Sequence, residues 1–94
     1  MATYVMFGKY SVGAVGEISA ERTKNAKALI RDLGGELKAT YALLGETDLL
    51  VIVELRGMEE AMKASAALSK LLGISFTTSP AVSGEDFDKL MEEA

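Results

Sequence analysis

The chain has 94 residues, 49% of them hydrophobic and 26% charged, which is the size and composition of one globular domain and not of a disordered segment. Its formal charge of −4 argues against nucleic acid or an acidic membrane as a partner, because phosphate binding needs a cationic surface. Cysteine and histidine are absent, which excludes disulfides, thiolate nucleophiles and imidazole chemistry, and we expect no metal ion or other cofactor.

The start of the chain, Met1-Ala2-Thr3-Tyr4, lacks the basic segment followed by an apolar one that marks a secretory signal. No apolar run approaches the length of a membrane-spanning helix. We therefore expect a single domain over residues 1–94 and a cytoplasmic location.

Four segments predict β-strands. Residues 3–10 and 48–55 are apolar on both faces, and the β-branched content of the second favours a strand over a helix. Residues 74–81 include Pro80, which cannot donate to a sheet ladder, so this strand is expected at an edge. Residues 36–44 alternate between apolar and polar side chains, which also suits an edge strand. One face of that strand would carry Leu37, Ala39, Tyr41 and Leu43.

Residues 11–17, with two glycines, predict a loop or a loose helical turn, and residues 45–47 predict a hairpin link. Helical spacing appears in three other places. The first predicted helix has Ser19 as its N-cap and Gly34 at its C-terminal cap. The second covers residues 58–72, and a short tail helix follows residue 83. The apolar stripes are Ala26, Leu29, Ile30 and Leu33, then Met58, Ala61, Met62, Leu68 and Leu72, and finally Phe87, Leu90 and Met91.

The order strand, helix, strand, strand, helix, strand predicts an α+β, ferredoxin-like βαββαβ fold with an antiparallel sheet and a C-terminal helix. Right-handed crossovers place the first and third strands in the middle of the sheet and the second and fourth at its edges. Both crossover helices must then cover the same face.

The other face of the predicted sheet is too apolar to stay in water. Exposing Leu50 and Ile52, or in the opposite facing Leu49, Val51 and Val53, would forgo about 1.5 to 3 kcal/mol per side chain. The tail helix has too few apolar side chains to cover four strands. We therefore expect a homodimer packed through the sheet faces, in which the tail can reach the partner, with a monomer capped by its own tail as the alternative.

Three segments resemble the GYD-domain family: residues 18–23 (I-S-A-E-R-T), 41–48 (Y-A-L-L-G-E-T-D) and 61–65 (A-M-K-A-S). The resemblance runs over essentially the whole chain. It implies a ferredoxin-like fold of the dimeric α/β-barrel type, in which two sheets face one another, and it implies no particular activity. Thr47 stands where the family has a tyrosine before the aspartate, so no role of that phenol is carried over.

The best polar cluster pairs Glu46 with Asp48 near the predicted hairpin. Such groups can assemble acid and base chemistry when other polar side chains join them. The simpler interpretation is that Gly45 supplies a turn conformation while Asp48 accepts hydrogen bonds from local backbone. We assign no catalytic residue. The candidate ligand-pocket residues are Lys9, Tyr10, Arg22, Tyr41, Glu46 and Asp48.

These patterns predict a small homodimeric protein that binds a small organic ligand in a regulatory or non-catalytic role. One alternative is a cofactor-independent enzyme of the monooxygenase, isomerase or decarboxylase type. In that case Arg22 would hold an anion, and Tyr10 or Glu46 would move a proton. Another alternative is a ligand-sensing module like the ACT domains.

Overall fold

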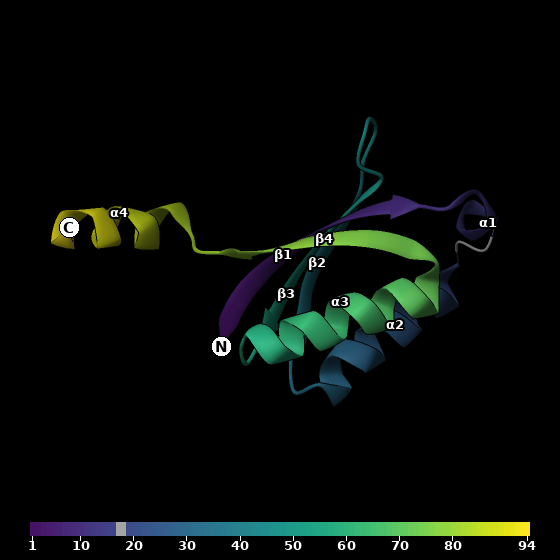
Figure 1. Ribbon diagram of the computed structural model, residues 1–94, viewed down its shortest axis with the longest axis horizontal. Helices are drawn as coiled ribbons and strands as arrows, with labels where there is room; N and C mark the ends of the chain where they lie inside the picture. Colours follow the sequence, from purple (N-terminus) through teal and green to yellow (C-terminus); the bar gives the residue numbers. More distant parts are fainter. Residues whose placement is uncertain (17–18) are drawn as a thin grey trace.

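Four strands form one antiparallel sheet, and helices connect and extend them (Figure 1). The computed structural model describes residues 1–16 and 19–94. In chain order the elements are β1 (Ala2–Tyr10), α1 (Val12–Val15), α2 (Ala20–Asp32), β2 (Glu36–Ala42), β3 (Leu49–Leu55), α3 (Met58–Leu72), β4 (Ile74–Ala81) and α4 (Gly84–Glu93).

The strands lie in the order β2-β3-β1-β4, and each pair of neighbours is antiparallel. The two strands with apolar residues on both faces are therefore central, as the sequence predicts. Pro80 lies in the edge strand β4. One side of an edge strand has no neighbouring strand, so the missing N–H of a proline can be tolerated there. The α+β, ferredoxin-like fold is confirmed.

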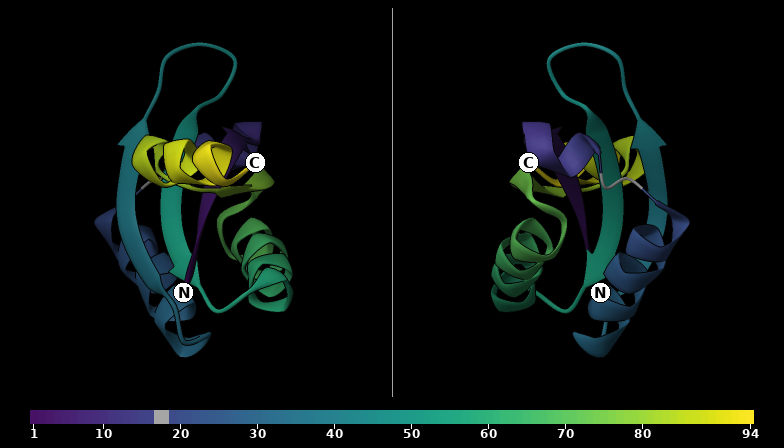
Figure 2. Two further views of the ribbon diagram at one scale, coloured as in Figure 1. Left: turned by 90° about the vertical axis from the view of Figure 1, so that its left-hand side faces the viewer. Right: turned by 90° about the vertical axis from the view of Figure 1, so that its right-hand side faces the viewer.

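Helices α2 and α3 lie side by side on one face of the sheet (Figures 1 and 2). Helix α2 begins after Ser19, whose Oγ accepts a hydrogen bond from the backbone N–H of Arg22 at 3.2 Å. Helix α3 ends at Gly73, which takes the left-handed conformation with φ of 66°. The capping residues thus fix where each crossover helix starts and stops.

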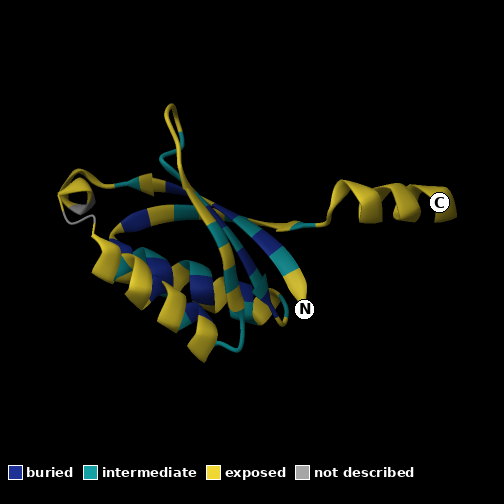
Figure 3. Ribbon diagram, turned by 180° about the vertical axis from the view of Figure 1, so that it is seen from behind, coloured by how far each residue is buried: buried dark blue, intermediate teal, exposed yellow. Residues whose placement is uncertain are grey.

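The hydrophobic core lies between these two helices and the sheet (Figure 3). Met6 of β1, Val53 and Leu55 of β3, Ile30 of α2 and Leu68 of α3 are fully buried. No charged side chain is buried among the residues that the structure describes. Burial of apolar surface, and not internal ion pairing, is therefore what holds the two layers together.

Strand β2 departs from the simple alternation predicted for it, because it contains a bulge. Leu37 pairs with Val53. Ala39 pairs with Ile52, so Lys38 is an extra residue in the ladder. Leu37 therefore packs toward the helices, while Ala39 faces the other way. The prediction that Leu37 and Ala39 share one face is wrong.

Two boundaries also differ from the predicted ones. β2 ends at Ala42, and the link to β3 spans residues 43–48 instead of 45–47. The backbone N–H of Leu43 donates to the carbonyl of Asp48 at 2.9 Å and closes this link. The segment predicted as a loop or helical turn contains α1, and its last residue, Glu17, lies outside the described residues.

The sheet face opposite α2 and α3, here called the open face, is apolar in its middle. Val51 and Val53 are buried under the helices, so Leu50 and Ile52 point to the open face. Phe7, which pairs with Leu50, is 40% exposed there. The apolar patch on this face consists of Val5, Phe7, Ala39, Tyr41, Leu50 and Ile52.

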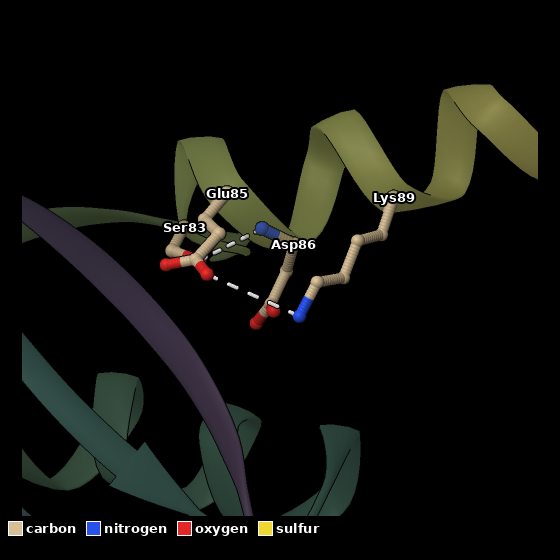
Figure 4. Close-up of polar contacts among 4 residues, drawn as sticks. All are labelled: Ser83, Glu85, Asp86 and Lys89. Atoms are coloured by element: carbon tan, nitrogen blue, oxygen red, sulfur yellow. Dashed lines mark hydrogen bonds and ion pairs between the residues drawn. The ribbon is translucent and has the colours of Figure 1, made fainter.

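Helix α4 projects from the end of β4 and lies apart from the other elements (Figures 1 and 3). Ser83 caps it, because its Oγ accepts a hydrogen bond from the N–H of Asp86 at 3.1 Å (Figure 4). Lys89 also pairs with Glu85 across one turn at 4.0 Å. None of its residues is buried, so it leaves the open face uncovered. Its apolar side chains, Phe87, Leu90 and Met91, are each about half exposed.

The turn from α2 into β2 passes very close to β3 at Gly35. A Cβ atom at this position would lie well inside van der Waals contact with the carbonyl oxygen of Glu54 and with the side chain of Leu55. Both neighbours belong to the packed central strand, so neither can move cheaply.

Gly35→Ala is therefore expected to lower the free energy of unfolding by about 1 to 3 kcal/mol, because the added methyl group overpacks the turn. Urea denaturation followed by circular dichroism measures the change. Gly84→Ala is the control, because a Cβ there meets no atom within 4 Å. An unchanged stability in the Gly35→Ala variant would contradict the close approach.

Candidate functional site

A cleft lies between the two crossover helices and the sheet, near the end of β1 and the start of α2. Its volume is about 100 Å³. That is several times the roughly 10–15 Å³ that one water molecule needs, so the cleft has room for a small organic molecule.

The polar side chains of the cleft come from three elements. Tyr10 is the last residue of β1, and Ser19, Arg22 and Thr23 belong to the cap and first turn of α2. Thr40 is supplied by β2. Thr40 pairs with the buried Val51, so its side chain faces the helices. It does so only because the preceding bulge reverses the alternation of side chains between the two faces of the sheet. These groups surround the cleft with hydroxyls and one guanidinium.

The side chain of Arg22 connects α2 to α3 beside the cleft. Its Nη2 donates a hydrogen bond to the carbonyl oxygen of Leu71, in the last turn of α3, at 3.1 Å. A cation is favourable there, because the C-terminal end of a helix carries partial negative charge. The bond holds the guanidinium at the cleft, between the start of one helix and the end of the other.

The rest of the cleft is apolar. Its walls come from β2, β3 and β4 together with the inner side of α3, and most of these side chains also belong to the hydrophobic core or pack against it. A ligand would therefore contact an apolar surface beyond the polar groups. The main apolar residues are Leu37, Val51, Leu68, Leu72, Ile74 and Phe76.

Arg22 is the charged residue among those that line the described part of the cleft. The sequence has 14 acidic and 10 basic residues. Arg22 lines the cleft, yet none of the described residues that line it is an aspartate or a glutamate.

The six residues predicted to form a ligand pocket do not all lie together in the structure. Tyr10 and Arg22 line the cleft. Lys9 and Tyr41 are exposed and lie on the open face, because each alternates with neighbours that face the helices. Glu46 is exposed in the link between β2 and β3. None of these last three residues lines the cleft.

Asp48, the sixth residue, binds backbone and does not line the cleft. Its Oδ2 accepts a hydrogen bond from the N–H of Tyr10 at 2.9 Å. Its own N–H donates to the carbonyl of Gly8 at 2.9 Å. The carboxylate therefore joins the start of β3 to the end of β1, and it fixes the backbone that carries the Tyr10 ring.

Sequence reasoning missed three hydroxyl residues of the cleft: Ser19 as a lining residue, Thr23 and Thr40. Thr23 lies four residues after Ser19, so helical spacing alone places both near Arg22 on the first turn. No sequence pattern places Thr40 in the cleft, because the face of the sheet on which its side chain lies depends on the bulge at Lys38.

Comparison with known families agrees with the sequence resemblance. The model of the GYD domain matches residues 4–91. The chain belongs to the GYD domain family. No match to this GYD-domain chain was found among curated proteins.

Solved structures share the fold of this GYD domain. One is the leucine response regulatory protein LrpA of Mycobacterium tuberculosis, with a TM-score of 0.58 and 8% identity, covering 87% of this chain and 51% of that chain. Another, described only as a glutamate-to-alanine mutant, has the same TM-score and identity and covers 87% of this chain and 50% of that chain. The chain thus spans about half the length of either structure, and at this identity the likeness concerns the fold alone.

The described part of the chain was also compared with the requirements of a membrane span and of a metal site, and it meets neither. No helix there is both long enough and apolar enough to cross a bilayer. Nor does any group of three or more acidic side chains within residues 1–16 and 19–94 lie in an arrangement that could hold a metal ion.

Asp48→Ala is expected to lower the free energy of unfolding by about 1 to 3 kcal/mol, because it leaves the N–H of Tyr10 without its acceptor. Asp48→Asn keeps an oxygen at this position and should lose less. Chemical denaturation of both variants measures the difference. Glu46→Ala, in the exposed link, is the control and should change stability by no more than about 0.5 kcal/mol. Equal stabilities of the Ala and wild-type proteins would contradict this role.

Proposed function

We propose that this GYD-domain protein is a small regulatory homodimer that binds a small organic molecule in the cleft between its helices and its sheet. The observation that carries the proposal is the cleft itself, in which an apolar interior meets a small set of convergent polar groups. Ligand sites in proteins commonly combine these two features.

A binding role fits the side chains of the cleft better than a catalytic one. Of the residues weighed for proton transfer, Glu46 lies away from the cleft and Asp48 is engaged with backbone. Tyr10 remains as the candidate proton carrier beside Arg22. That pair keeps a cofactor-independent enzyme as the second candidate, in which Arg22 holds an anion and Tyr10 moves a proton.

The likeness of the fold to a leucine response regulatory protein gives a precedent for a regulatory role. It also favours a ligand-sensing module, the other alternative drawn from the sequence. The precedent concerns architecture, because 8% identity carries no residue correspondence.

The homodimer part of the proposal rests on the apolar patch of the open face. Phe7 and Tyr41 are 40% and 56% exposed, and they adjoin Leu50 in the registered ladders. A contiguous apolar surface of this kind marks an interaction site in soluble proteins. Two-fold symmetry lets one patch cover another copy of itself, which gives the face-to-face arrangement of a dimeric α/β barrel.

Helix α4 supports the same assembly. A helix of ten residues is marginally stable alone in water, yet α4 has both an N-terminal cap and an apolar stripe. It projects away from the rest of its own domain, as Figures 1 and 3 show. In the proposed dimer its stripe packs on the second copy.

Leu50→Lys and Ile52→Lys are each expected to convert the dimer into a monomer of 10.0 kDa, because an ammonium group in the packed interface loses its hydration. Size-exclusion chromatography with light scattering measures the mass. Wild-type mass in both variants would count against the sheet-to-sheet dimer.

Two controls accompany the mass measurement. Leu44→Lys should keep the dimer mass, because Leu44 is fully exposed in the link. Val51→Lys should unfold the chain instead of separating two folded copies, because Val51 is buried under the helices. Circular dichroism distinguishes the two effects.

A thermal-shift screen of small organic acids, alcohols and amides tests the cleft. A ligand at 100 times its Kd should stabilise the protein by about 2.7 kcal/mol. Thr40→Tyr, which places a ring in the cleft, is expected to abolish the shift, whereas Lys24→Tyr on the exposed side of α2 should keep it. The cleft would be ruled out by a screen without any shift, or by a shift that Thr40→Tyr leaves unchanged.

A further inference from the structure

We propose that α4 of one copy docks in a groove between α3 and β4 of a second copy, so that two copies exchange their C-terminal helices. This inference rests on the proposed homodimer, in which the stripe of α4 packs on the partner, and it names the surface that receives the stripe. It is carried by a groove and a helix of the same chain that both expose large apolar side chains.

The groove lies between the first half of α3 and the end of β4, and its volume is about 420 Å³. Met58 and Met62, one turn apart on α3, form one wall and are 72% and 66% exposed. Pro80 of β4 lines the groove from the strand side. Exposed methionines suit a surface that binds another apolar element, because the unbranched side chain adapts its shape to the partner.

The polar groups in the groove have partners inside the protein. Oγ1 of Thr78 donates a hydrogen bond to Oγ of Ser65 at 3.1 Å, which joins β4 to α3. Oγ of Ser69 donates to the carbonyl oxygen of Ser65 at 2.8 Å. An apolar guest can therefore cover Thr78 without leaving its hydroxyl proton unpaired.

Helix α4 has the side chains and the length of such a guest. Phe87, Leu90 and Met91 are spaced i, i+3 and i+4, so they form one stripe, and each is about half exposed. A helix of ten residues is about 15 Å long, and the groove follows α3 from Met58 to Ser65 over roughly 10 Å. An amphipathic helix that lays anchors at this spacing into an apolar groove is a recurrent mode of recognition.

The link between β4 and α4 favours the groove of a second copy over that of the same copy. Only Val82 and Ser83 separate the two elements. Ser83 is the N-cap and has the extended conformation typical of a cap, with φ of −65° and ψ of 158°. A reversal onto the chain's own groove would therefore fall on Val82, and valine is not among the residues that favour turns.

The direction of α4 agrees with this argument. Figures 1 and 3 show that α4 continues outward from the end of β4 and away from α3. Each copy thus offers one helix and one groove, so a two-fold axis satisfies both contacts at once and closes the dimer. Exchange of an identical element between two copies is a low-cost route to such a dimer.

Engineered disulfides test the exchange, because the chain has no cysteine of its own. Met62→Cys and Leu90→Cys chains are co-expressed, oxidised and analysed by intact mass spectrometry, and a disulfide between these two variants can only join separate copies. We expect it to form at least about tenfold faster than a disulfide between Met62→Cys and Lys89→Cys chains, because helical spacing places Lys89 on the opposite side of α4 from the stripe. Equal rates for the two pairs would overturn the docking of the stripe.

A chain that carries both Met62→Cys and Leu90→Cys separates exchange from docking within one copy. Exchange predicts a covalent dimer as the main product of oxidation. A disulfide that is confined to the mass of a single chain would overturn the exchange and assign α4 to its own groove.

Phe87→Ala measures the contribution of the stripe without a new covalent bond. It should raise the Kd of the dimer at least about tenfold in analytical ultracentrifugation, because it removes a central aromatic anchor. Alanine favours the helix, so this loss would not reflect unfolding of α4. Lys89→Ala is the matched control and should leave the Kd unchanged. A Kd that Phe87→Ala also leaves unchanged would overturn the proposal.

The outcomes separate the exchange from the proposed dimer. If the unmodified chain is a dimer but no disulfide joins positions 62 and 90, the exchange is overturned while the dimer stands. If the unmodified chain is a monomer by light scattering, both are overturned. If the disulfide between copies forms and Leu50→Lys leaves the dimer mass unchanged, the exchange stands and the contact between open faces is overturned.

Discussion

Strands β1 and β3 lie in the middle of the sheet and carry apolar side chains on both of their faces. Met6, Val51 and Val53 face the helices and are buried, while Phe7, Leu50 and Ile52 face the other way. Because one layer of helices can cover only one of these faces, the fold leaves the second apolar surface to another contact. The single sheet thus accounts both for the core of the domain and for its proposed assembly.

The two faces of the sheet are suited to different tasks. On the helix side, the first turn of α2 and the last turn of α3 lie close enough for Arg22 to reach the carbonyl of Leu71, and the cleft lies under this bridge. On the open face, Lys9 and Tyr41 lie apart from that cleft. The proposed ligand binding and the proposed dimerisation therefore use separate surfaces of one small domain.

The sequence was sufficient for the fold, because its signals are local and repeated. The stripe that ends at Leu72, the cap at Ser19 and the proline at residue 80 each fix one element without reference to the others. The site was predicted less completely. The bulge at Lys38 turns the side chain of Thr40 to the opposite face of the sheet. The hydrogen bond of Asp48 joins segments that are 38 residues apart in the sequence. Neither feature produces a periodic pattern from which it could have been predicted.

Methyl NMR with a soluble paramagnetic probe tests whether a second copy covers the open face of the sheet. Such a probe broadens the signals of methyl groups that solvent can reach. If a second copy covers the open face, the methyl signals of Ile52 stay as sharp as those of the buried Val53, while those of the fully exposed Leu44 broaden. Broadening of Ile52 to the same extent as Leu44 would contradict it.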